Sequence, residues 1–138
     1  MDSGAEKCVL IIDEQLPAGL AVNTGVVLAF TLGSRMAALI GPDVLDRSGQ
    51  SHPGITTLPF PILKARAEQI TAIRLRASEM DSLFVVDFTD TAQSTKTYED
   101  YTAKLAALLA EELRYLGLAL YGKREAINRL TGSLPLLR

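Results

Sequence analysis

Hydroxyl and carboxylate side chains are concentrated in one stretch of this sequence, VVDFTDTAQSTKTY, which spans residues 85–98. The stretch overlaps the end of an apolar segment, and open α/β sheets place their ligand sites just beyond the carboxyl ends of strands. Asp90 could accept a proton or orient a water molecule there. Ser94 and Thr95 offer hydroxyl groups, which become useful nucleophiles only beside an activating base. The stretch therefore predicts Asp90, Ser94 and Thr95 as candidate catalytic residues.

Two further polar residues, Asn23 and Thr24, interrupt an apolar segment that runs from residue 16 to residue 32. A buried amide or hydroxyl group without a partner costs roughly 1–3 kcal/mol, so both side chains need a hydrogen bond. They could line a polar site, or they could bond back to carbonyl groups of their own helix. We expect Asn23 and Thr24 to bind substrate in a pocket that joins the start of this helix to Asp90.

Other kinds of catalytic and cofactor site lack their sequence signals. The chain has no glycine-rich phosphate loop, no Walker lysine, no spaced set of Cys and His residues, and no nucleophile elbow around a serine. These absences argue against a nucleoside triphosphatase, a zinc protein and a triad hydrolase. Asp87 and Asp90, with Asp13 from an earlier strand, could gather around Mg²⁺, but acids that follow strands more often cap helices and turns. We therefore expect neither a metal nor a cofactor.

The only histidine, His52, lies in a loop of residues 41–61 that is rich in Gly and Pro. These residue types favour turns, so the sequence predicts His52 as an exposed turn residue rather than a catalytic base. We expect a hairpin around residues 47–50 and a short strand at residues 55–58. The sequence leaves open the role of this loop and of His52.

Charge and hydropathy limit the partners and the location of the protein. The 138 residues include 14 Lys and Arg against 16 Asp and Glu, a formal net charge of -2, which gives no broad positive surface for nucleic acid. The first seven residues lack the cationic start of a secretory signal, and residues 16–32 fall short of an apolar membrane span of about 20 residues. The single cysteine, Cys8, fits a small core residue in a reducing compartment. We expect a cytoplasmic protein with no membrane partner, and the sequence carries no strong signal for a nucleic-acid partner, which would need a local basic patch.

Apolar runs and helical periodicity predict an α/β domain. Continuous apolar runs of β-prone residues are typical of strands that are covered on both faces, and apolar spacings of three and four indicate amphipathic helices. The predicted strands are residues 8–12, 83–86 and 116–122, and the predicted helices are residues 17–33, 64–81, 97–113 and 123–131, with Thr97 as an N-cap and Gly132 as a left-handed C-cap. This alternation indicates a single three-layer α/β/α domain over residues 1–138 with a mixed central sheet. Residues 1–6 are expected to be flexible.

Four segments together carry a family resemblance: KCVLIIDEQLPAGLAVNT, HPGITT with PILKA, VVDFTD, and YLGLALYGKREAINRLTGSLPLLR. From about Lys7 to Arg138 the chain resembles a bacterial family known as domain of unknown function 2000. That family is similar in fold to the type 2 peptidyl-tRNA hydrolases, whose pattern closes with a strand ending in glycine, a short helix and an LTG-x-L tail. LALYG and LTGSL resemble this ending, so the resemblance implies a type 2 peptidyl-tRNA hydrolase-like fold.

The same resemblance implies two alternative functions. The hydrolases keep a lysine and a glutamine at the start of the opening helix, and an aspartate with a nearby threonine after the penultimate strand. Asp90 resembles that aspartate and Ser94 or Thr95 could replace the threonine, whereas the opening helix reads LAVNTGVV and has no lysine. The chain is therefore either a cofactor-independent hydrolase or transferase that acts on an ester or amide, such as an aminoacyl or peptidyl ester, or a non-catalytic binding or assembly module. The resemblance also implies that the protein could form a homodimer.

Overall fold

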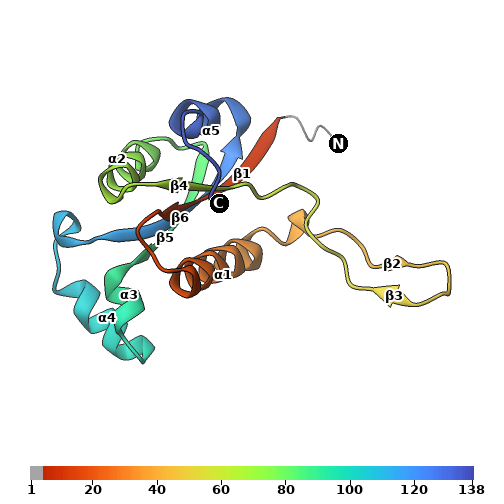
Figure 1. The fold of residues 1–138 in the computed structure, drawn as a ribbon, viewed down its shortest axis with the longest axis horizontal. Helices are drawn as coiled ribbons and strands as arrows, with labels where there is room; N and C mark the ends of the chain where they lie inside the picture. Colours follow the sequence, from red (N-terminus) through yellow and green to blue (C-terminus); the bar gives the residue numbers. More distant parts are fainter. Residues whose placement is uncertain (1–4) are drawn as a thin grey trace.

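The computed structural model describes residues 5–138, which form a mixed central sheet with helices on both faces (Figure 1). The sheet has the strand order β4-β1-β6-β5. β1 and β4 run parallel, while β6 is antiparallel to both β1 and β5. The four strands are β1 (Glu6–Asp13), β4 (Ile62–Ala65), β5 (Leu83–Thr89) and β6 (Tyr115–Lys123). The predicted mixed sheet is confirmed.

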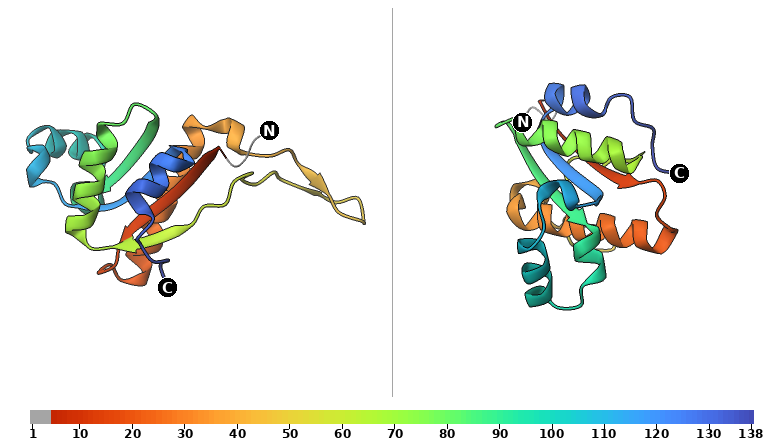
Figure 2. Two further views of the ribbon diagram at one scale, coloured as in Figure 1. Left: turned by 90° about the horizontal axis from the view of Figure 1, so that it is seen from above. Right: turned by 90° about the vertical axis from the view of Figure 1, so that its left-hand side faces the viewer.

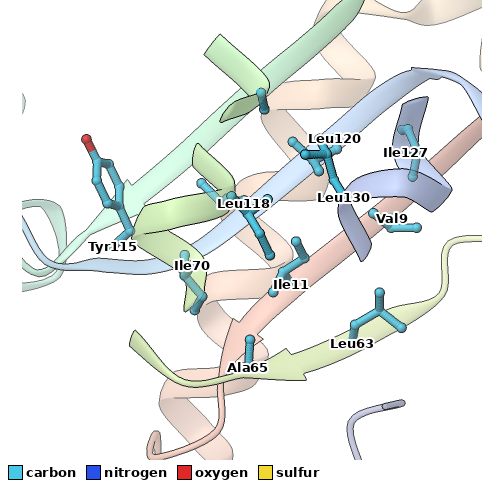
Figure 3. Close-up of a cluster of buried hydrophobic side chains, with 12 residues drawn as sticks. Val9, Ile11, Leu63, Ala65, Ile70, Tyr115, Leu118, Leu120, Ile127 and Leu130 are labelled. Atoms are coloured by element: carbon cyan, nitrogen blue, oxygen red, sulfur yellow. The ribbon is translucent and has the colours of Figure 1, made fainter. Parts of the chain in front are cut away.

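The helices form one layer on each side of the sheet because successive residues of a strand point to opposite faces. α1 (Ala18–Arg35) packs on the face that carries Cys8 and Ile12. α2 (Ala67–Ser78) and α5 (Arg124–Thr131) pack on the other face, where Val9 and Ile11 meet Ile70 and Ile127 in a continuous apolar cluster (Figure 3). This arrangement confirms the three-layer α/β/α domain.

The polar stretch after the second predicted strand divides between a strand and two helices. β5 continues as far as Thr89, which caps α3 (Asp90–Ser94), and α4 (Tyr98–Ala106) follows. Thr97 is the N-cap of α4, as predicted, because its Oγ1 accepts a hydrogen bond of 3.1 Å from the N–H of Asp100. The predicted helix 97–113 is too long. Leu109 is extended, and the carboxylate of Glu112 accepts its N–H at 3.0 Å, which starts a separate 3-10 helix, η2 (Ala110–Glu112).

A hairpin arm, residues 40–57, extends away from the body of the protein (Figure 1; Figure 2, left). It follows the short 3-10 helix η1 (Ala37–Leu39) and contains β2 (Val44–Leu45) and β3 (Ser51–His52). The hairpin predicted around residues 47–50 is confirmed. The strand predicted at residues 55–58 is wrong, since only Thr56 forms an isolated bridge there. The strand lies further on, at β4, where the carbonyl of Pro61 accepts the N–H of Leu10 and the parallel pairing begins.

The C-terminal end of the chain lies against the sheet. The C-terminal tail covers the free edge of β4, where the N–H of Lys64 donates to the carbonyl of Pro135 at 2.9 Å. Gly132 has φ -61, so the predicted left-handed cap is wrong. Glycine suits this position because a β-carbon would lie 2.7 Å from the carbonyl oxygen of Asn128. Of the segment 1–6 that was expected to be flexible, residues 1–4 lie outside the described residues, and Glu6 is the first residue of β1.

Candidate functional site

The two predicted halves of the site are joined through their helices. Asn23 on α1 donates from Nδ2 to Oε1 of Gln93 on α3 at 3.4 Å, and α3 begins at Asp90. Both Asn23 and Asp90 are exposed to solvent. The fold therefore brings the polar part of α1 beside the helix that carries Asp90, although no hydrogen bond connects these two side chains within residues 5–138.

The hydroxyl groups of the predicted site donate to backbone carbonyls of their own helices. Thr24 is fully buried and donates to the carbonyl of Leu20 at 2.8 Å. Ser94 donates to the carbonyl of Thr91 at 3.2 Å, and Thr95 donates to the same carbonyl at 3.1 Å. These bonds follow the i−3 and i−4 pattern of serine and threonine in helices. None of the three hydroxyls faces a side-chain base among the described residues.

An ion pair fixes the end of the sheet next to Asp90. Nη2 of Arg114 lies 2.8 Å from Oδ2 of Asp13, whose carboxylate is completely buried at the end of β1. The hydrogen bond and the charge of Asp13 raise the pKa of the Arg114 guanidinium, and the charge of Asp90 adds a smaller contribution. The N–H of Asp90 donates to the carbonyl of Arg114 at 3.0 Å. Arg114, which directly precedes β6, thus joins the end of β1 through its side chain to the start of α3 through its carbonyl.

The remaining candidates for chemistry lie apart from one another. Oδ2 of Asp87 accepts from Nε of Arg74 at 3.2 Å on the α2 side of the sheet. His52 lies on the arm, where its Nε2 is 2.9 Å from Oδ2 of Asp46. Burial raises the pKa of the Cys8 thiol to about 12, which leaves it inert at neutral pH. Within residues 5–138, no three His, Cys, Asp or Glu side chains converge as they would around a metal ion.

A cleft of about 410 Å³ lies between α1, β5, α3 and α4, next to the polar stretch. Its volume falls in the range of about 300–1,000 Å³ that is common for small-molecule sites. Its walls are formed by aliphatic and aromatic residues together with hydroxyl-bearing residues, one lysine and one aspartate. The lining residues are Val27, Thr31, Val86, Asp87, Phe88, Ala92, Thr95, Lys96, Thr97, Tyr98 and Tyr101.

The cleft lies further along α1 than the predicted site. Asn23, Val27 and Thr31 are spaced by four residues and therefore share one face of α1. Val27 and Thr31 line the cleft, so it begins one turn after Asn23. Of the five predicted site residues, Thr95 alone lines it. Thr31 interrupts the apolar helix as Thr24 does, and its position on the same face as Asn23 is the signal in the sequence that could have located the cleft.

Lys96 and Tyr101 each bring to the cleft a polar group that is available to a ligand. Among residues 5–138, Lys96 makes no ion pair and the Tyr101 hydroxyl makes no hydrogen bond. Burial, followed by the charge of Asp87 and by Tyr98, raises the pKa of Tyr101, which keeps this phenol protonated and able to donate at neutral pH. The Tyr98 and Tyr101 rings meet edge to face, with centroids 5.5 Å apart. Since Arg74 pairs with Asp87, Lys96 carries the unbalanced charge of the cleft.

Comparisons with known proteins describe the family and the fold. The family model "Protein of unknown function (DUF2000)" matches residues 6–138. The chain is similar to the solved structure of a protein of unknown function from Agrobacterium tumefaciens strain C58, with a TM-score of 0.86 and 17% sequence identity over 96% of this chain and 97% of that chain. Among curated proteins no sequence matches. None of the helices between residues 5 and 138 combines the length and the apolar character needed to cross a membrane.

Proposed function

We propose that this chain, which belongs to the DUF2000 family, is a binding module for a small molecule with an apolar or aromatic body and one anionic group. The cleft between α1, β5, α3 and α4 holds this ligand. Its apolar body packs on Val27, Val86 and Phe88, and its anionic group lies beside Lys96. The proposal takes up the non-catalytic alternative and assigns it a ligand of defined chemistry.

The observation that carries the proposal is the unpaired Lys96 at a cleft where apolar and aromatic side chains are mixed with hydroxyl-bearing residues and where the one acid, Asp87, already pairs with Arg74. Small-molecule sites commonly combine an apolar wall with a few polar groups that fix the orientation of the ligand. Lys96 supplies a positive charge, and Tyr101 supplies a hydroxyl donor. A carboxylate or phosphate satisfies both groups, because the Lys96 ammonium group and the Tyr101 hydroxyl can each donate a hydrogen bond to its oxygens.

The hydrolase or transferase alternative has less support from the same geometry. It requires Asn23, Thr24 and Asp90 to share one water-accessible pocket, and none of the three lines the cleft. It also requires an activated hydroxyl or an oriented water molecule. The hydroxyls of Ser94 and Thr95 donate to the backbone instead.

Titration calorimetry with two matched probes tests the proposal. The anionic probe is 4-phenylbutyrate and the neutral probe is 4-phenylbutan-1-ol, which has the same ring and chain. We expect the anion to bind more tightly than the alcohol. Lys96→Ala should weaken binding of the anion by roughly three- to tenfold, since Lys96 is exposed and its contribution is that of a surface ion pair, and should leave binding of the alcohol unchanged.

Lys104→Ala is the matched control, because Lys104 is an exposed lysine of α4 that does not line the cleft. Its affinity for 4-phenylbutyrate should equal that of the wild type. Equal affinities of the anion and the alcohol for the wild-type protein, or no binding of either, would contradict the proposal.

A further inference from the structure

The arm, residues 40–57, exposes apolar side chains that no other part of the described chain covers. Val44 and Leu45 of β2 are 61% and 68% exposed. β2 and β3 pair with each other and pack on no helix or strand of the body (Figure 1). An isolated two-stranded hairpin is at best marginally stable in water, and strands of two residues are shorter than most. The arm therefore lacks a supporting surface within its own chain.

A second apolar surface lies at the root of the arm. A groove of about 330 Å³ runs between α1, the start of β4 and the C-terminal tail, and none of its lining residues has a polar side chain. Val22 and Val26 line it from α1, and Phe60 and Ile62 line it from the segment that directly follows the arm. Phe30 continues the exposed apolar stripe along α1, at the same spacing of four residues.

The arm cannot fold back into the groove of its own chain without breaking its root. A β-carbon at Gly54 would lie 1.8 Å from the carbonyl oxygen of Gly41, so the two backbones pass in direct contact. The N–H of Gly41 donates to the carbonyl of Ile55 at 2.8 Å. The N–H and the hydroxyl of Thr57 both donate to the carbonyl of Leu39. These bonds fix the direction of the arm away from the body, as Figure 2 (left) shows.

We propose that a second copy of this chain occupies the groove, and that the two copies exchange arms in a two-fold symmetric dimer. One chain carries both complementary surfaces, an apolar arm and an apolar groove next to its root. With a two-fold axis near the root, the arm of each copy lies on the groove of the other. All four apolar surfaces are then covered at once, because a two-fold symmetric contact repeats each interaction in reverse. A different partner would have to supply a match for the arm and for the groove separately. The exchange goes beyond the proposed ligand binding, which uses the cleft beside Val27 and Thr31 of α1 rather than the groove beside Val22 and Val26.

Sedimentation velocity of the full chain with three variants tests the exchange. We expect the wild type to sediment as a dimer at micromolar concentration. The arm variant, Val44→Asp with Leu45→Asp, and the groove variant, Val26→Asp, should each raise the dissociation constant by roughly a hundredfold or more, because a two-fold interface carries every substitution twice. Both should keep the circular dichroism spectrum of the wild type.

Leu75→Asp is the matched control, since Leu75 on α2 is 63% exposed, close to the 57% of Val26, and lies outside both the arm and the groove. It should remain a dimer. The arm variant changes residues that support no other element of their own chain, so it decides the question even if Val26→Asp fails to fold. A monomeric wild type, an arm variant that stays dimeric, a folded Val26→Asp that stays dimeric, or a Leu75→Asp that dissociates as readily as the arm variant would overturn the exchange.

Discussion

Thr24 of α1 lies directly against Gly117 of β6: a β-carbon at Gly117 would be 2.7 Å from Cγ2 of Thr24 and 2.9 Å from the carbonyl oxygen of Ile11. This contact sets the depth at which α1 packs on the sheet. It also explains why Thr24 is buried and why its hydroxyl turns back to the carbonyl of Leu20. α1 in turn supplies one wall of the cleft through Val27 and Thr31.

Gly117→Ala should destabilise the protein by about 1–3 kcal/mol, because the extra methyl group overpacks a contact that includes backbone atoms. Urea unfolding followed by circular dichroism measures this change. Gly33→Ala on α1 is the control, since no atom lies within 4 Å of a β-carbon there. It should be neutral or stabilising by up to about 1 kcal/mol, because alanine favours the helix. Equal destabilisation by both substitutions would contradict the packing assigned to Thr24 and Gly117.

Arg114→Met should leave the buried carboxylate of Asp13 without its charged partner. The cost should be about 1–3 kcal/mol, towards the lower end because the Arg114 side chain is 52% exposed and water can reach the vacated place. Arg76→Met, on the exposed side of α2, should change the free energy of unfolding much less. Adding Asp13→Asn to Arg114→Met should recover part of the loss, since the double variant buries no charge. A double variant that is no more stable than Arg114→Met alone would rule out this account.

The turn of the arm should open in acid. Hydrogen bonds from His52, then from Ser48 and Gln50, lower the pKa of Asp46 from 3.8 to about 2. A carboxyl group whose pKa is lowered by folding stabilises the folded form above its ordinary pKa, and this stabilisation is lost as the pH falls through the lowered value. We therefore expect the turn to weaken between pH 3.8 and about 2.

Carboxyl NMR titration of Asp46 measures this pKa directly. His52→Ala should raise it towards 3.8, whereas Arg47→Ala, a change at a neighbouring exposed residue, should leave it low. An Asp46 pKa that is unchanged by His52→Ala would show that the histidine does not hold the turn.

The Cys8 thiol should resist modification in the folded protein. It is fully buried, and its pKa is raised to about 12, so almost no thiolate forms at neutral pH. The aromatic disulfide reagent 5,5′-dithiobis(2-nitrobenzoate) should react with Cys8 of the native protein only as fast as the fold opens. In denaturant it should react immediately. Rapid reaction of the native protein would place Cys8 at the surface.

The sequence predicted the layers of the fold well because the strands are continuous apolar runs with helices between them. β1, β5 and β6 contain the predicted runs and extend beyond them by one to three residues at an end, as β5 does through Asp87, which pairs with Arg74. It failed at residues 55–58 and at Gly132. Strand pairing at β4 depends on Leu10, which is distant in the sequence. The close approach at Gly132 depends on where the carbonyl of Asn128 lies. The types of the neighbouring residues indicate neither of these contacts.

The sequence indicated which elements border the cleft better than it indicated which residues line it. The polar stretch does border the cleft, through Thr95 and Lys96, and α1 does lie opposite. The sequence could not show that the hydroxyls of Thr24, Ser94 and Thr95 are used by their own helices, because a hydroxyl that bonds to the backbone and one that lines a site have the same local sequence. Nor could the sequence show that Thr31 and Tyr101 line one cleft, because only the packing of α4 beyond β5 makes them neighbours.

The most direct test of ligand binding is a map of backbone amide chemical shifts during titration of the wild-type protein with 4-phenylbutyrate. We predict saturable changes at Val27, Thr31, Val86, Lys96 and Tyr101, and none at the groove residues Val22 and Val26. Lys96→Ala should reduce the affinity, and Lys104→Ala should not. Changes confined to the groove or to the region around Asp90, or the absence of saturable changes at the cleft, would contradict the central claim.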